Sequence, residues 1–99
     1  MTWDQVKKLA LAMPKVEEGT SYGTPALKVK KKLIVRLREE GDVIVLKMPF
    51  DQRDAMMMEA PDKFFITDHY RDYEYVLVRL KNVTREEMRD LLRAAYKNT

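Results

Sequence analysis

Hydrophobic and polar residues alternate most regularly between residues 26 and 48, and this stretch organises the rest of the chain. It contains three runs rich in β-forming residues, and only short polar segments separate them. In the first run, Leu27 and Val29 share one face and Lys28 and Lys30 the other, because successive side chains of a strand point to opposite faces. Breaks this short allow hairpins but not a parallel crossover, so the pattern predicts a three-stranded antiparallel meander.

The second and third runs determine which side chains reach the outer face of this meander. The second run divides into an apolar set and a mixed set, namely Leu33, Val35 and Leu37 against Ile34, Arg36 and Arg38. If the apolar set packs inward, the outer face carries a group of cations: Lys28, Lys30, Arg36 and Arg38. Residues 43–46 are apolar on both sides, so this run is either an interior strand or a strand whose outer side a partner covers.

Two helices with the same capping pattern are expected near the ends of the chain. Thr2 and Thr84 are each followed, three residues later, by Gln or Glu, which is the pattern of a capping box. Apolar residues then recur at helical spacing, which predicts amphipathic helices over residues 3–13 and 85–97. Pro14 is expected to end the first of them.

The remaining segments complete the predicted fold. They are a turn-rich segment over residues 15–25, a tight turn with Gly41 at positive φ, a helix over 52–60 capped by Asp51, and strands over 64–67 and 75–80 joined by a polar and aromatic loop. The order α-β-β-β-α-β-β-α predicts an α+β two-layer sandwich, with a five-stranded, mainly antiparallel sheet and the helices on one face. The open face would also carry Arg79, with Ile34, Tyr75 and Leu77 among the cations.

Composition limits the class of protein. The 99 residues predict a single domain over 1–99, and a content of 45% hydrophobic and 35% charged residues is typical of a soluble globular protein. Nineteen basic and 16 acidic side chains give a net charge of +3, which is informative only if the cations cluster. The absence of cysteine excludes disulfides and thiolate metal sites. The N-terminus lacks the apolar core of a signal peptide and no run approaches the ~18 apolar residues of a membrane span, so we expect a cytoplasmic protein with no membrane partner.

Two segments carry a resemblance to a known family. Residues 17–29, EEGTSYGTPALKV, and residues 69–78, HYRDYEYVLV, look like the two hallmark segments of the MmcQ/YjbR-like family. Residues 13–16, MPKV, resemble the turn that precedes the first hallmark. The chain departs from the family pattern at Lys15, where a glycine is usual, and at Leu27, where an aromatic residue is usual.

This resemblance, which covers nearly the whole chain, implies a fold and a function. The fold is α-β-β-β-α-β-β-α, of the secretion-chaperone or frataxin-like type, in agreement with the order of elements predicted above. The family is described as DNA-binding, partly from a wing-like hairpin. No enzymatic activity, catalytic residue or cofactor comes with the resemblance, so we expect a protein that is not an enzyme.

The basic strand face is the first candidate site. Its members, expected to contact DNA phosphates, are Lys28, Lys30, Lys31, Lys32, Arg36 and Arg38. The alternative interpretation is a solvated sheet face whose lysines prevent aggregation. A second basic stripe on the last helix consists of Arg85, Arg89, Arg93 and Lys97. There, Glu86 and Asp90 are spaced to pair with the arginines, which favours an ordinary solvated flank.

The only histidine, His69, lies in an aromatic segment and suggests a ligand site. One histidine without cysteine supplies too few ligands for a transition metal, so no metal site is predicted. Ser21 lies in no nucleophile motif, and no catalytic residue is assigned. The sequence therefore predicts DNA binding through the basic face and its hairpin. The alternative is a protein-interaction module, including a homodimer, anchored by Ile34, Tyr75 and Leu77 on the open face. A third hypothesis is a small-ligand pocket near Tyr22, His69 and Tyr73.

Overall fold

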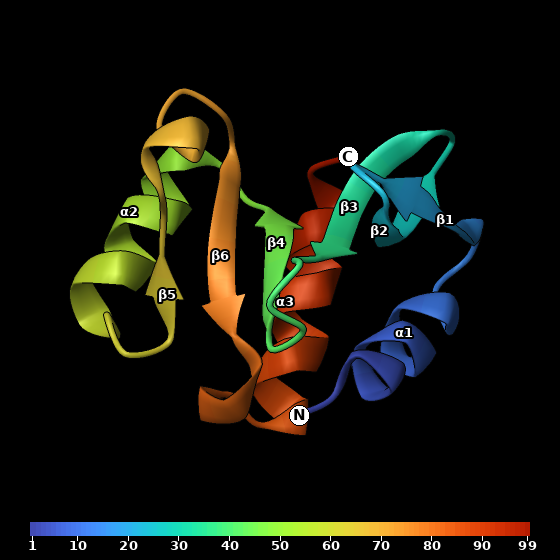
Figure 1. Ribbon diagram of the computed structural model, residues 1–99, viewed down its shortest axis with the longest axis horizontal. Helices are drawn as coiled ribbons and strands as arrows, with labels where there is room; N and C mark the ends of the chain where they lie inside the picture. Colours follow the sequence, from blue (N-terminus) through green and yellow to red (C-terminus); the bar gives the residue numbers. More distant parts are fainter.

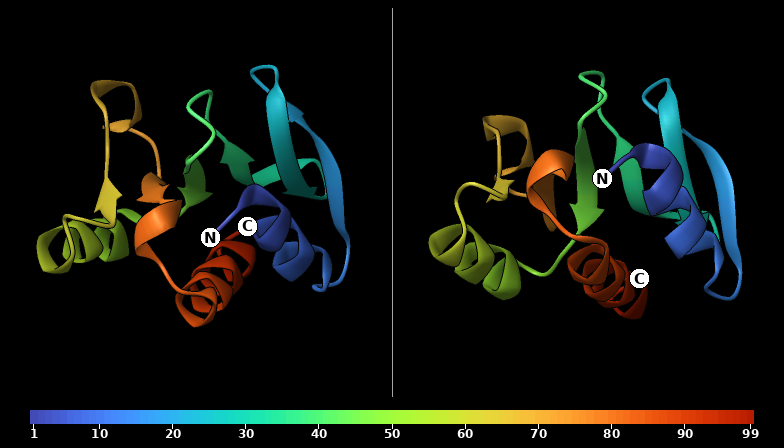
Figure 2. Two further views of the ribbon diagram at one scale, coloured as in Figure 1. Left: turned by 60° about the horizontal axis from the view of Figure 1, so that its bottom comes forward. Right: turned by 90° about the horizontal axis from the view of Figure 1, so that it is seen from below.

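The computed structural model describes all 99 residues and shows three α-helices on one side of a single antiparallel sheet (Figures 1 and 2). The elements, in chain order, are α1 (Trp3–Leu11), β1 (Val16–Ser21), β2 (Thr24–Val29), β3 (Lys32–Leu37), β4 (Val43–Lys47), α2 (Phe50–Glu59), β5 (Phe64–Phe65), the 3-10 helix η1 (Asp68–Tyr70), β6 (Tyr75–Arg79), the 3-10 helix η2 (Leu80–Asn82) and α3 (Arg85–Lys97). The predicted α+β class with helices on one face is confirmed. No helix has both the length and the apolar character needed to cross a membrane.

The sheet has six strands in the order β1-β2-β3-β4-β6-β5, so the prediction of five strands was wrong. The missing strand was β1, which falls in the segment expected to consist of turns. β1 pairs with β2 from Val16 opposite Val29 to Ser21 opposite Thr24, although its four central residues are exposed. An edge strand of this kind buries little side-chain surface, and its sequence therefore lacks the alternation that reveals the other strands.

A β-bulge in β3 changes the faces on which its residues lie. Leu27 pairs with Val35, but the next residue of β2, Lys28, pairs with Leu33, so Ile34 is the extra residue. A shift of one residue moves the side chains beyond it to the opposite face. Ile34 therefore joins Val35 in the helix-side core, and Leu33 turns to the other face, the reverse of the predicted phase for both.

Two hydrophobic clusters stabilise the sheet from opposite sides. The larger cluster lies between the sheet and the helices and includes Ala10 of α1, Leu46 of β4 and Leu92 of α3. The smaller cluster lies on the other face and consists of Val43, Val45, Tyr70 and Leu77. Residues 66–74, which include η1, thus cover part of the face that the sequence predicted to be open.

The capping predictions for the two terminal helices are confirmed. Thr2 with Gln5 and Thr84 with Glu87 both form complete capping boxes. α2 starts two residues earlier than predicted, and no side chain caps it, so the capping role assigned to Asp51 was wrong.

Candidate functional site

The six cations predicted to line one basic face lie in three different environments. Lys30, Lys31 and Lys32 are exposed, Lys28 and Arg38 are partly buried, and Arg36 is buried. The lysines at the end of the β2–β3 hairpin are the only members that protrude freely. We call Lys30–Lys32 the lysine turn.

Backbone geometry makes the lysine turn a tight connection. Val29 and Lys32 pair across the hairpin, and the two residues between them, Lys30 and Lys31, have φ values of 50° and 68°. Positive φ at both central residues is the geometry of a type I′ turn, which matches the twist of the flanking strands. None of the three lysines takes part in an ion pair.

Arg36 is buried, and its predicted role as an exposed phosphate contact was wrong. Arg36 is only 5% exposed to solvent. Its guanidinium donates hydrogen bonds to the Tyr70 hydroxyl at 2.9 Å and to Thr24 Oγ1 at 3.1 Å. The only carboxylate in contact with it belongs to Glu39, at 3.6 Å, and the Glu39 side chain is 62% exposed. A charged group with so little water around it requires these hydrogen bonds, so Arg36 connects the sheet to the loop above it.

Arg38 lies just beyond the end of β3, where it forms ion pairs with two carboxylates. Its Nε lies 3.4 Å from Glu40 and 4.0 Å from Glu39. The backbone amide of Glu39 lowers the pKa of the Glu39 carboxyl, and the charges of Arg36 and Arg38 lower it further, so this carboxylate remains ionised at neutral pH. Arg38 is therefore largely neutralised within the protein.

Ile34 and Leu77 are both completely buried, so their predicted roles as anchors of an exposed partner surface were wrong. Ile34 lies in the helix-side core because of the bulge. Leu77 does lie on the predicted face, but Tyr70 and its loop cover it.

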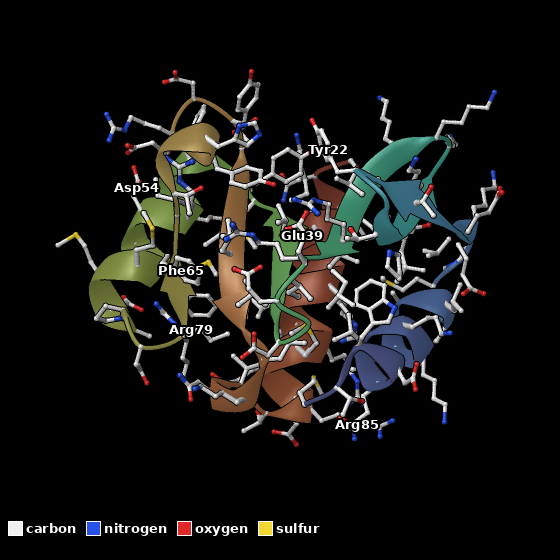
Figure 3. All side chains as sticks on the ribbon, in the orientation of Figure 1. Tyr22, Glu39, Asp54, Phe65, Arg79 and Arg85 are labelled. Carbon is white, nitrogen blue, oxygen red and sulfur yellow. The ribbon has the colours of Figure 1, made fainter.

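The other predicted contact residues meet in one cleft, which we call the aromatic cleft. Its volume is about 310 Å³. The lining residues come from the β1–β2 turn, β3, β4, the loop after β5 and β6, and they are Ser21, Tyr22, Leu33, Arg36, Val45, His69, Tyr70, Tyr73 and Tyr75. Figure 3 shows Tyr22 and Glu39 on the side of the sheet turned toward the viewer; Tyr22 lines this cleft, and Glu39 lines a neighbouring hollow.

One wall of the aromatic cleft is the turn between β1 and β2. Tyr22 and Gly23 have φ values of 53° and 78°, so this is a second two-residue turn with the type I′ pattern. Tyr22 is 76% exposed, and the Arg36 guanidinium lies 5.2 Å from the centre of its ring. Tyrosine in this left-handed conformation costs free energy that glycine or asparagine would largely avoid.

The opposite wall is the loop that carries His69, Tyr70 and Tyr73. The ring of His69 meets that of Tyr70 edge-on at 4.7 Å and lies 6.2 Å from that of Tyr73. Tyr75 lies at the floor, where burial raises the pKa of its hydroxyl and the neighbouring Tyr70 and Tyr22 raise it further. Tyr75 therefore stays neutral near pH 7.

Arg53 of α2 holds this loop, although the sequence analysis assigned it no role. It is 5% exposed, and its Nη1 donates to the backbone carbonyls of Tyr73 at 2.8 Å and Tyr70 at 3.1 Å. Longer contacts reach the carbonyls of Arg71 and Tyr75. No local pattern signals this role, because polar Gln52 and Asp54 flank Arg53 and only the tertiary structure brings the loop carbonyls to it.

The basic stripe of α3 also differs from expectation. Lys8, Arg85, Arg89 and Arg93 line one hollow of about 310 Å³ between α1 and α3. The expected pairs of Glu86 with Arg89 and Asp90 with Arg93 are absent from the ion pairs of the structure. This hollow is a second cluster of uncompensated cations, and Figure 3 shows Arg85 at the end of the molecule opposite Tyr22.

Comparison with known proteins identifies the family but not the function. No curated protein matches this sequence. The crystal structure of the Deinococcus radiodurans protein DR2400, which contains a DUF419 domain, has the same fold, with a TM-score of 0.82 and 20% sequence identity over 96% of this chain and 75% of that one. The two segments that carry the family resemblance, residues 17–29 and 69–78, both contribute lining residues to the aromatic cleft. The family model described as YjbR matches residues 11–98, and the chain therefore belongs to the YjbR family.

Proposed function

We propose that this domain is a non-enzymatic nucleic-acid-binding domain that contacts phosphates through the lysine turn. The observation that carries the proposal is the position of Lys30, Lys31 and Lys32: all three are exposed at a hairpin end, and no carboxylate neutralises them. A protruding basic hairpin can follow a phosphate backbone and release its counterions. The DNA binding implied by the family resemblance supports the same proposal.

Two partly buried lysines, Lys28 and Lys47, extend the basic surface beyond the lysine turn. Lys32 and Lys47 line one hollow together with Leu33 and Tyr75. Lys28 lies beside Gly19 of β1. These residues replace Arg36 and Arg38, whose charges are used within the protein, as the candidates for further phosphate contacts.

A catalytic role is not favoured by the geometry of the polar groups. Ser21 and His69 both line the aromatic cleft, but no hydrogen bond joins them, whereas an activated serine nucleophile needs a base within hydrogen-bonding distance. No group of three histidine, aspartate or glutamate side chains is arranged to hold a metal ion. The proposal is therefore one of binding alone.

The test is a salt titration of binding to a fluorescently labelled DNA duplex, measured by anisotropy. The wild-type protein should bind at low salt, with an affinity that falls steeply as salt rises. Lys31→Glu should weaken binding and reduce the log–log salt slope by about 0.9 for each phosphate that the variant no longer neutralises. The matched control is Lys81→Glu, which makes the same charge change in η2, directly after the C-terminal end of β6. It should change the affinity and the salt slope little. Absence of binding at low salt, or equal effects of the two variants, would refute the proposal.

A further inference from the structure

We infer that the aromatic cleft binds an unpaired nucleotide base, so that the domain prefers single-stranded over double-stranded nucleic acid. The inference rests on the proposed function, because the lysine turn supplies the phosphate contacts of the same strand. It adds a role for Tyr22, His69 and Tyr73, which the phosphate contacts do not use.

Exposed rings on both walls give the cleft the character of a stacking site. Tyr22 is 76% exposed and Tyr73 is 57% exposed, and they are two of the five large hydrophobic side chains that the protein leaves exposed. Both line the same cleft. Flat aromatic rings that stay accessible to solvent are the surfaces on which single-stranded binding proteins stack successive bases.

The backbone that carries both rings is ordered before any ligand binds. Tyr22 is fixed in a two-residue turn, and Arg53 fixes the carbonyl of Tyr73 with a 2.8 Å hydrogen bond. A site whose walls are already ordered loses less conformational entropy on binding. Tyr22, whose φ of 53° is strained, is thus one of the residues that line the cleft.

The size and shape of the cleft favour a single base over a base pair. Its volume of about 310 Å³ is at the lower end of the range for small-molecule sites. In a duplex the faces of the bases are covered by their stacked neighbours, so a base can enter only when it is unpaired or flipped out. The tyrosine and histidine rings offer faces for stacking, together with hydroxyl and imidazole groups that can hydrogen-bond to base edges.

The charge of the cleft is also suitable for a nucleotide. The buried Arg36 guanidinium lies against Thr24, Tyr70 and the ring of Tyr22, and its only carboxylate neighbour, Glu39, is mostly in solvent. The guanidinium donors of Arg36 are engaged within the protein, so Arg36 makes no phosphate contact, but its positive charge still favours the electron-rich edge of a base in the cleft. A cationic ligand is disfavoured for the same reason.

The aromatic cleft adjoins a hollow that contains one residue of the lysine turn, Lys32. Leu33 and Tyr75 line both the aromatic cleft and the neighbouring hollow that contains Lys32 and Lys47. A strand whose base enters the cleft can therefore pass over Tyr75 and place its next phosphates at these lysines. This connection is the reason for assigning both surfaces to one nucleic-acid chain.

The experiment compares a labelled 12-nucleotide oligo(dT) with a labelled 12-base-pair duplex, measured by anisotropy at one low salt concentration. Tyr22→Asn and Tyr73→Ser remove the two rings. Asparagine tolerates positive φ and Asn-Gly favours the type I′ turn, so Tyr22→Asn should fold at least as well as the wild type. Tyr96→Phe, a tyrosine of α3 whose hydroxyl donates to the Pro14 carbonyl away from the cleft, is the control variant.

The wild type should bind oligo(dT) more tightly than the duplex. Each ring variant should weaken oligo(dT) binding by about 5- to 150-fold and leave duplex binding nearly unchanged, because the stacking of one base is removed. Lys31→Glu should weaken both. Equal affinity for the two probes, with no effect of Tyr22→Asn or Tyr73→Ser, would overturn the inference and leave the proposed function intact. Absence of binding to either probe would overturn both.

A second measurement reports stacking directly. An oligo(dT) that carries one 2-aminopurine should lose fluorescence when it binds the wild-type protein, and the loss should be much smaller with Tyr22→Asn at saturating protein. Equal quenching by both proteins would show that the base lies outside the cleft and would overturn the inference.

Discussion

Replacing Arg53, one of the two buried charged residues, with methionine should destabilise the protein. The substitution keeps the unbranched stem of the residue and removes its hydrogen bonds to the loop over the sheet. Two of these bonds, to Tyr73 at 2.8 Å and to Tyr70 at 3.1 Å, have good geometry. A hydrogen bond to a charged group contributes about 1.5–3 kcal/mol, and the cost of burying the guanidinium offsets part of the total. The expected loss of unfolding free energy is about 2–3 kcal/mol.

Urea unfolding monitored by circular dichroism measures this loss. For a domain of this size, the expected change corresponds to a fall of about 10–20 °C in Tm, since each kcal/mol lowers Tm by about 4–8 °C. Asp54→Asn is the matched control, because it removes only the 3.3 Å contact of Arg53 Nε with a carboxylate that is 61% exposed. That control should cost less than about 0.5 kcal/mol.

A loss below about 1 kcal/mol in Arg53→Met would refute this reasoning. It would mean that the burial of Tyr70 and its bond to Arg36 hold the loop without Arg53. Arg53→Met should also change the walls of the aromatic cleft, since His69 and Tyr73 lie on the loop that Arg53 holds.

Three further changes test other parts of the structure. Lys15 has a φ of 64°, so Lys15→Gly should stabilise the protein by about 0.5–1 kcal/mol in urea unfolding, whereas Lys15→Ala, which keeps the strained conformation, should not. Glu87→Gln should lower stability because Glu87 accepts a 2.6 Å bond from Lys63, and this partner lowers the pKa of Glu87 while Glu87 raises that of Lys63. The stability difference between wild type and Glu87→Gln should be present at neutral pH. It should vanish as pH falls below the lowered pKa of Glu87 and also as pH rises above the raised pKa of Lys63. A stability difference that is independent of pH would contradict the ion pair. Arg89→Glu should weaken duplex binding if the cationic hollow between α1 and α3 also contacts phosphates, and unchanged anisotropy titrations would exclude that surface.

The sequence predicted the elements whose side chains differ clearly between a buried and an exposed side. The terminal helices and their capping boxes follow from local hydrogen bonds and helical spacing, and the structure confirms them. The turn at Gly41, with a φ of 86°, follows from the freedom of glycine. The meander from β2 to β4 follows from alternation and short connections.

The faces of the strands could be predicted only in part. Lys28 and Arg36 do share the face opposite the helices, but the bulge in β3 reverses the expectation for Ile34 and Leu33. A bulge depends on how two strands pair, and alternation within one strand does not record it. β1 was missed for a related reason, since pairing with β2 orders a segment whose side chains remain in water.

The sequence by itself thus determined the fold class, the capped helices and the positions of the lysines and aromatic residues along the chain. Only the tertiary structure decided which cations are accessible to a ligand. Arg36 is buried and donates hydrogen bonds to Thr24 and Tyr70, whereas the lysine turn is exposed to solvent. It also decided that Tyr22 and Tyr73, 51 residues apart in the sequence, line the same cleft. The physical reason is that burial and proximity depend on contacts between distant segments, which local pattern does not encode.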